Sequence, residues 1–403
     1  MTVPEHDDFD PTSTDDPREL HAVYDDLRAR CPVAHTSAHG GYWALTRHED
    51  VKAAAGDSRL FISSVRAVVP SDPRGLRRPP LNFDAPRHTP YRRALDRTLQ
   101  RRRLGRLEPV LRDHARRELG VMIARGEGDI AAEFGSDFPA WVTTEWLNLD
   151  REVAPVLART ASAWVDAWRN LDRDVVNEMS EQMYQIARDL VSSRAVDPMD
   201  PVVDPASSLL AERVDGEPLE QEQIVGALRQ SLVVGMVAPP ILIAAVCEHL
   251  SADPDLQHHL RTHPEEIPAA VEEFVRLYTP YRGFARTVSE EVELRGRTIR
   301  PEEPVTLVYA AANRDPEVFE EPHEFRPDRA NIHEHLGFGR GRHQCAGMPL
   351  ARMMLRLALE ELLTATESFE VMRVGAGARM PEIGPTELHV RFTAAGPAHA
   401  TGS

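Results

Sequence analysis

Apolar residues return at helical spacing along most of the chain between about residue 90 and residue 250. Within this stretch, apolar side chains recur every three or four positions, which is the period of an amphipathic helix. Further segments with the same period lie before and after it. The pattern therefore predicts helices at residues 19–30, 91–99, 107–119, 153–164, 175–191, 221–250, 268–278 and 347–364.

Strands are predicted where apolar and polar residues alternate, at 40–47, 292–299, 305–309 and 387–392. Residues 70–90 contain six prolines, too many for regular structure. They predict a long loop, a kind of segment that often carries function. The acidic composition of residues 1–17 predicts a flexible tail. The expected fold class is mainly α with a small β portion (α+β).

Composition and charge exclude several classes of protein. The chain has 403 residues and a net charge of −17, which argues against binding nucleic acid through its phosphates. Its three cysteines lie far apart and form no disulfide framework, so we expect a reducing, cytoplasmic environment. The N-terminus lacks the basic start and apolar centre of a signal peptide. The longest apolar run, residues 232–247, contains two prolines and is short for a bilayer, so we expect no membrane span.

The loop around Cys345 carries the clearest chemistry. Gly337, Gly339 and Gly341 allow a sharply turning backbone that another group can approach closely. Cys345 lies directly before the predicted helix at 347–364, and the positive end of a helix favours a thiolate over a thiol. A flat metal centre with a thiolate beneath it would need this arrangement.

The sequence F-G-x-G-x-H-x-C-x-G at 338–347 resembles the haem-binding loop of the cytochrome P450 family. The resemblance implies that Cys345 is the axial ligand of the iron in haem b (iron protoporphyrin IX). Three neighbours of Cys345 in this motif are also expected to contact the cofactor: Phe338, Gly339 and Gly347.

The resemblance covers nearly the whole chain, from about residue 20 to residue 395. It implies a single haem domain at 18–398, although length alone would favour two or three domains. The haem is then expected between a long central helix at 221–250 and the cysteine loop.

Three more residues match a charged triad of the family. Glu273 and Arg276 have the i,i+3 spacing that places both side chains on one face of a helix. Arg329 lies in a segment, 311–329, that resembles the family's meander. The resemblance implies that the three side chains clamp the haem loop by charge-assisted hydrogen bonds.

Four further positions resemble the family's contacts to the haem propionates: His88, Arg92, Arg286 and His343. His88 and Arg92 lie one helical turn apart, and His343 lies in the cysteine loop itself. Positively charged groups suit this task, because both propionates must be neutralised when a haem is buried.

The central helix departs from the family pattern. The family usually has an acid followed by an alcohol here, and the resemblance implies that this pair organises the water that delivers protons during oxygen activation. This chain has Val237 and Ala238 at the two positions, and neither side chain carries a proton. Oxygen activation would then use a substrate hydroxyl, ordered water or another pocket residue. Pro239 and Pro240 follow and predict a kink, because an interior proline removes a helix hydrogen bond.

The resemblance also indicates which segments would line a substrate pocket. They are the loop at 62–84, the helices between 160 and 195, the segments 236–238 and 279–284, and the chain near residue 385. The candidate lining residues are apolar or aromatic: Met236, Val237, Ala238, Tyr281, Phe284 and Trp164. Such side chains also fill ordinary protein cores, so both roles stay open for each of them.

Separate redox partners, a ferredoxin and a ferredoxin reductase, are implied because the chain carries no flavin or iron–sulfur module. A basic cluster is the candidate docking surface for an acidic ferredoxin, and charge complementarity would speed the encounter. It consists of Arg97, Arg101, Arg102, Arg103 and Arg106, with Arg340 and Arg342 nearby. We expect a monomer that binds a small-molecule substrate, and neither nucleic acid nor a membrane.

Three functions stay open on this basis. The first is a haem-thiolate monooxygenase that oxidises a small organic molecule, aromatic or a natural product, with dioxygen. The second is oxidative C–C or C–N coupling, nitration or peroxide-driven chemistry on the same scaffold. The third is a haem protein that senses a ligand without turnover. A zinc site of His343 and Cys345 is a distant alternative, since no second ligand pair has metal spacing.

Overall fold

The structure, a computed structural model, describes residues 7–70 and 77–396. Its contacts divide these residues between two compact units. The first unit contains residues up to Thr89, Glu273–Cys345 and Gly377–Gly384, and the second contains Pro90–Glu272, Ala346–Ala376 and residues from Pro385 onward. Parts of three predicted segments lie outside the described residues: 1–6 of the tail, 71–76 of the loop, and 397 and 398 of the domain. The single domain at 18–398 stays a prediction.

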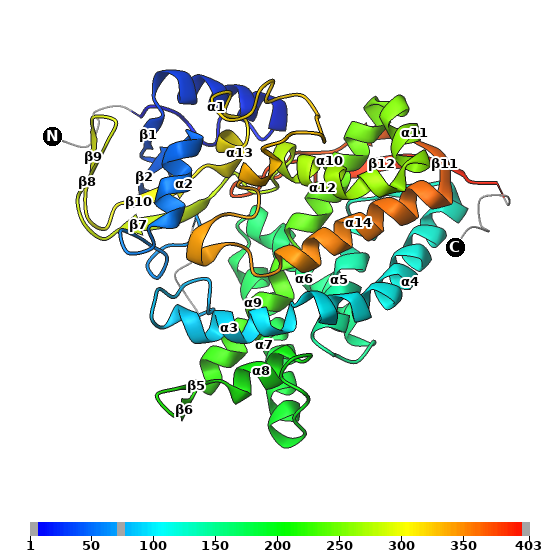
Figure 1. Ribbon diagram of the computed structural model, residues 1–403, viewed down its shortest axis with the longest axis horizontal. Helices are drawn as coiled ribbons and strands as arrows, with labels where there is room; N and C mark the ends of the chain where they lie inside the picture. Colours follow the sequence, from blue (N-terminus) through cyan, green and yellow to red (C-terminus); the bar gives the residue numbers. More distant parts are fainter. Residues whose placement is uncertain (1–6, 71–76, 397–403) are drawn as a thin grey trace. The chain divides into compact units, whose positions relative to one another are not determined.

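A five-stranded sheet in the order β1-β2-β10-β7-β3 forms the centre of the first unit (Figure 1). β2 pairs antiparallel with β1 and parallel with β10, and β7 pairs antiparallel with β10 and β3. The alternating patterns at 40–47 and 305–309 correctly predict β2 and β10, whereas the single strand predicted at 292–299 is a hairpin of two strands, β8 and β9. The strands of the unit are β1 (Val33–Thr36), β2 (Tyr42–Leu45), β3 (Phe61–Ile62), β7 (Phe284–Val288), β8 (Val292–Leu294), β9 (Arg297–Ile299) and β10 (Pro304–Leu307).

Alternate side chains of this sheet belong to two different apolar clusters. Leu45 packs in the cluster that contains Val51 of α2 (His48–Gly56), whereas its neighbour Ala44 packs in the cluster that contains Leu20 of α1 (Pro17–Arg30). Successive residues of a strand point to opposite faces, which explains the division. The other helical segments of the unit are short: η1 (Ala38–Gly40), α13 (Tyr309–Ala312), η3 (Ile332–Glu334) and η4 (Gly341–His343).

The chain before α1 is anchored where the sequence predicts a flexible tail. Asp8 accepts a hydrogen bond from the backbone N–H of His35 at 2.8 Å and pairs with Arg297 at 2.8 Å. Asp16 is the N-cap of α1 and accepts from the backbone N–H of Arg18 at 2.8 Å. These contacts correct the prediction for residues 7–16.

The second unit is mainly helical, and α14 lies along α4 in it (Figure 1, orange and cyan). The helical periodicity of the sequence correctly predicts most of these helices. Its helices are α4 (Arg101–Arg125), α5 (Phe134–Trp146), α6 (Val153–Arg169), α7 (Arg173–Val196), α8 (Pro205–Ala211), α9 (Gln221–Val234), α10 (Ala238–Ala252), α11 (Pro254–Thr262), η2 (Pro264–Glu266) and α14 (Met348–Ala365). The boundary between the two units falls within two helices of the sequence, α3 (His88–Thr98) and α12 (Ile267–Leu277).

Two small sheets complete the second unit. Three strands pair in the order β11-β12-β4, and the other two form the hairpin β5-β6. The strand predicted at 387–392 corresponds to β12. The bounds are β4 (Glu127–Asp129), β5 (Arg213–Val214), β6 (Glu217–Pro218), β11 (Thr366–Val374) and β12 (Leu388–Ala394). The expected fold class, mainly helical with a small sheet portion, is therefore confirmed.

The single helix predicted at 221–250 is two helices, α9 and α10, with a break at 235–237. Pro239 and Pro240 follow the first residue of α10, where a proline fits because its missing N–H has no partner in the first turn. The expected kink is thus a full break just before the prolines. The combined segment Gln221–Ala252 is long and apolar enough to cross a membrane by length and composition, but 72% of its most apolar window is buried.

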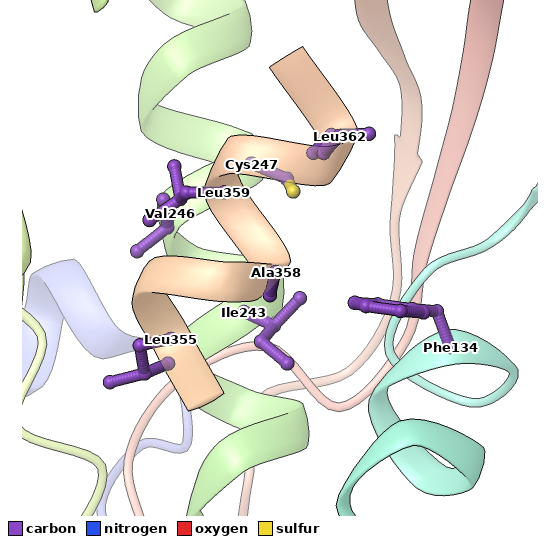
Figure 2. A pocket seen from close by; sticks show the side chains of 8 residues that line it. All are labelled: Phe134, Ile243, Val246, Cys247, Leu355, Ala358, Leu359 and Leu362. Atoms are coloured by element: carbon purple, nitrogen blue, oxygen red, sulfur yellow. The ribbon is translucent and has the colours of Figure 1, made fainter. Parts of the chain in front are cut away.

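A small cavity lies where α10, α14 and α5 meet in the second unit (Figure 2). Its volume is about 10 Å³, roughly the smallest space that holds one water molecule, and its walls are apolar. Burial raises the pKa of the Cys247 thiol, which lies at this cavity, to about 12. The cavity is therefore a packing gap in the core. It is lined by Phe134, Ile243, Val246, Cys247, Leu355, Ala358, Leu359 and Leu362.

Candidate functional site

The cysteine loop of the first unit is held by its own backbone and by α2. The backbone N–H of Cys345 donates to the carbonyl oxygen of Phe338 at 2.8 Å. Gly339 and Gly341 have φ angles of +66° and +73°, in the region that favours glycine. A Cβ at Gly341 would lie 2.3 Å from the carbonyl oxygen of Ala55, so only glycine permits this approach to α2. The thiol of Cys345 is left exposed.

The structure brings the three residues of the predicted triad together. Glu273 and Arg276 have side chains that are 0% exposed, and Arg276 donates two hydrogen bonds to the carboxylate at 2.6 and 2.7 Å. Arg329 donates a third to the same carboxylate at 2.9 Å. Charged groups at this depth remain only where partners satisfy them, and the paired geometry of arginine with carboxylate provides this.

Asn313 links the triad to the start of the cysteine loop, and the sequence did not single out this residue. Its backbone carbonyl accepts from Arg276 at 2.8 Å, and its side-chain amide donates to the hydroxyl of Thr279 at 2.6 Å. Its side-chain oxygen accepts from the backbone N–H of Leu336 at 2.6 Å. The residue is fully buried, so these bonds fix the loop relative to α12. The only signal in the sequence was its position inside the meander-like segment 311–329.

His88 and His343 lie together in the first unit. Their ring centroids are 4.6 Å apart, and His343 Nε2 lies 3.7 Å from a carboxylate oxygen of Asp84. Burial raises the pKa of Asp84, but the nearby His343 and hydrogen bonds from the backbone N–H groups of Ser63 and Ser64 outweigh it and hold the pKa well below its usual range. An ionised carboxylate therefore faces His343. Asp84 was missed in the sequence, where it is one acid in a proline-rich loop.

Arg286 lies buried on β7, close to a second residue that the sequence did not single out. Burial raises the pKa of Tyr309, and the positive charge of Arg286 opposes this rise. A Cβ at Gly339 would lie 3.4 Å from the Tyr309 hydroxyl, so the ring borders the cysteine loop. The ring of Phe284 lies 6.4 Å from that of Tyr309 and 4.9 Å from that of Tyr281. Aromatic contacts thus connect the two predicted pocket residues to the loop.

The other predicted site residues belong to the second unit. Arg92 lies one turn after His88 on α3 and pairs with Asp96 at 2.7 Å. Gly347 is the N-cap of α14, and its carbonyl oxygen accepts from the N–H of Ala351 at 2.8 Å. Trp164 stacks on Trp168, with ring centroids 5.7 Å apart.

The break between α9 and α10 contains the remaining predicted residues. Met236 and Val237 are buried, and Ala238 is the first residue of α10. A Cβ at Gly235 would lie 2.8 Å from the Thr143 hydroxyl oxygen, so a glycine is needed where the break meets α5. None of the side chains at 236–238 has a hydrogen-bond donor or an ionisable group, so these three side chains cannot carry a proton.

Comparisons with known proteins agree in the family they indicate. The family model described as Cytochrome P450 matches residues 248–374. The chain is similar to the mycinamicin IV hydroxylase/epoxidase of Micromonospora griseorubida, with 33% identity over 352 residues, covering 85% of this chain and 87% of that protein. It is also similar to the cyclomarin C epoxidase CymV of Salinispora arenicola, with 29% identity over 375 residues, covering 90% of this chain and 92% of that protein.

Solved structures with a similar fold cover nearly the whole chain. The cytochrome P450 CYP109Q5 from Chondromyces apiculatus has a TM-score of 0.86 at 25% identity, covering 96% of this chain and 98% of its own. CYP108D1 from Novosphingobium aromaticivorans has a TM-score of 0.83 at 27% identity, covering 94% and 95%. The likeness therefore includes both units of the chain.

The buried triad generates a prediction about stability. Glu273→Gln removes the negative charge while keeping the shape, so two buried guanidinium groups lose their counter-charge. We expect the free energy of unfolding, measured by denaturant titration, to fall by about 3–5 kcal/mol.

The adjacent Glu272 provides the matched control, since it pairs with Arg352 at 2.6 Å but its side chain is 22% exposed. Glu272→Gln is expected to change the free energy of unfolding by less than about 1 kcal/mol, because solvent screens partly exposed pairs. Equal effects of the two substitutions would contradict the clamping role of the triad.

Proposed function

The chain belongs to the cytochrome P450 family, and on that premise we propose that it is a monooxygenase that inserts oxygen into an apolar natural-product molecule. The observation that carries the proposal is the cysteine loop, in which the thiol of Cys345 is exposed on a backbone fixed from several sides. The similarity to a mycinamicin hydroxylase/epoxidase and a cyclomarin C epoxidase supports a natural-product substrate.

The residues of the site fit the haem that members of this family bind. Cys345 offers an exposed sulfur as the iron ligand, while His88, His343 and Arg286 offer buried nitrogen donors for two carboxylates. When bound, the haem supplies the iron that activates oxygen, with electron density pushed onto it by the thiolate. We assign the same propionate-binding role to Arg92 from its position on α3. Phe338, Gly339 and Gly347 would border the cofactor.

The polarity of the predicted lining residues supports an apolar substrate. Met236, Val237 and Ala238 are apolar, and Tyr281 and Phe284 add aromatic surface. Because Val237 and Ala238 cannot hold or pass a proton, we propose that a substrate hydroxyl or ordered water takes over that task. A substrate that carries its own hydroxyl near the reacting carbon fits this site best.

The aromatic rings of Tyr281 and Phe284 favour a second candidate function, oxidative coupling of aromatic substrates. Coupling removes hydrogen atoms or electrons from two molecules and joins them, so no oxygen atom enters the product. The hydrogen atoms that are removed reduce the oxygen to water, so coupling needs the same activated oxygen and the same supply of protons as insertion. The product therefore separates the two functions.

Contacts among the described residues reduce the number of arginines that the proposed ferredoxin surface can contain. Arg97 pairs with Glu212 at 2.9 Å, and Arg103 donates to the side-chain oxygen of Asn148 at 2.9 Å, so both are used inside the second unit. Three arginines of the predicted cluster are exposed and available for an acidic partner: Arg101, Arg102 and Arg106. We propose these three as the contact for a ferredoxin that a ferredoxin reductase supplies with electrons.

The assignment of the iron ligand is tested by the absorption of the reduced carbon monoxide complex. Cys345→His keeps a ligand but removes the thiolate, so the red-shifted band typical of thiolate ligation is expected to disappear. Cys31→Ser, at a half-buried cysteine of the same unit, is expected to keep this band. A red-shifted band in the Cys345→His protein would exclude the assignment.

Oxygen insertion is tested by turnover under labelled dioxygen, ¹⁸O₂, with a panel of macrocyclic and aromatic natural products. Insertion predicts a product that carries one ¹⁸O atom. Coupling predicts a dimer without the label. Mass spectrometry of the product distinguishes the two outcomes. Spectral shifts on substrate binding without any product, across the whole panel, would instead support a sensor.

The docking surface predicts a salt-dependent rate. Charge reversal at Arg102 and Arg106 should lower the rate of reduction by ferredoxin about tenfold at low salt, because steering of an acidic partner is lost. The difference should shrink at high salt, which screens the charges.

Arg391→Glu is the control for this pair, since Arg391 is an exposed arginine of the same unit on β12. Stopped-flow absorbance measures the rates. An equal loss in the control, or no loss in the double variant, would contradict the proposed surface.

A further inference from the structure

The sheet β11-β12-β4 of the second unit brings together three side chains that bind metals in proteins. Asp129 ends β4, and the sheet register places it directly opposite His389 of β12. Glu387 directly precedes β12, and its carboxylate lies 3.0 Å from His389 Nε2. One imidazole and two carboxylates therefore lie together beside the sheet.

The three candidate ligand atoms lie close enough together for a tetrahedral zinc ion to be reached by small side-chain movements. His389 Nε2 lies 3.0 Å from an oxygen of Glu387 and 3.9 Å from Oδ2 of Asp129. One ligand atom from each residue lies within 4.8 Å of the other two. Two ligands bound about 2.0–2.1 Å from a tetrahedral zinc are about 3.4 Å apart, which falls between the two measured values. Small side-chain rotations would complete the geometry.

Asp129 is already fixed in the orientation that such a site needs. Its Oδ1 accepts hydrogen bonds from the backbone N–H groups of Ala131 and Ala132 at 3.0 Å and of Leu388 at 3.1 Å. The side chain of Asp129 is 12% exposed, whereas those of Glu387 and His389 are each 40% exposed. Oδ2 of Asp129 faces His389 and accepts no hydrogen bond from any residue that the structure describes. A carboxylate oxygen at this depth gains most from a cation beside it.

We propose that Asp129, Glu387 and His389 bind one Zn²⁺ ion that ties β4 to β12. The two carboxylates neutralise the double charge, and the imidazole nitrogen favours zinc over magnesium or calcium, which prefer oxygen ligands alone. A water molecule is the fourth ligand. Arg373 donates a hydrogen bond to the Glu387 oxygen that also faces His389, so it competes with the ion.

The site is tested on the full haem-containing protein after treatment with a chelator. Titration calorimetry with zinc chloride is expected to show one bound ion in the unchanged protein. The affinity should be at least about tenfold lower in His389→Ala. His333→Ala is the matched control, because His333 is an exposed histidine with one carboxylate, Glu334, 3.6 Å away. It is expected to bind zinc as the unchanged protein does. Magnesium should not displace the ion.

Two further measurements separate a zinc site from an ordinary network of ion pairs. Arg373→Gln should tighten zinc binding, since the competing guanidinium is gone. Anomalous diffraction from zinc-soaked crystals should place the ion within bonding distance of His389 Nε2. The proposal is overturned if His389→Ala binds zinc unchanged, if His333→Ala loses the ion equally, if Arg373→Gln binds no more tightly, or if no anomalous peak lies there.

Discussion

A single buried carboxylate, that of Glu273, fixes the meander and the start of the cysteine loop in the first unit. Two guanidinium groups donate to it, and neither Glu273 nor Arg276 has any exposed side-chain surface. Removing charges from water is costly, so this arrangement persists only while all partners remain in place. The cost is offset because the same guanidinium groups also bind backbone carbonyls of the meander, including that of Asn313. Through Asn313 the constraint reaches Leu336, and from there the loop that presents Cys345.

Much of this arrangement could be predicted from the sequence, because it depends on local spacing. Glu273 and Arg276 are three residues apart on a helix, and the glycines before Cys345 mark a loop that turns sharply. Asn313, Asp84 and Tyr309 could not be predicted in this way. Their roles depend on which distant segments the fold places beside them, and one amide, acid or phenol in a loop carries no periodic signal.

The errors have the same physical origin. Residues 7–16 look like an acidic tail because their partners, such as His35 and Arg297, lie far away in the sequence. The break at 235–237 was predicted as a kink in one helix, since Met236 and Val237 remain buried and preserve the apolar pattern across it. Hydrophobic periodicity records which side chains are buried, and it does not record whether the backbone hydrogen bonds continue.

The triad and the helix break differ in how much substitution each of them tolerates. Substituting Glu273 leaves buried charges without partners, so the triad tolerates little change. Val237 and Ala238 form no side-chain hydrogen bonds, and an apolar residue there leaves no buried polar group unsatisfied. The constraints on the cysteine loop and on the helix break are therefore independent. On the proposed function, a site without the acid and alcohol keeps its fold, and the substrate hydroxyl or ordered water proposed above would deliver the protons.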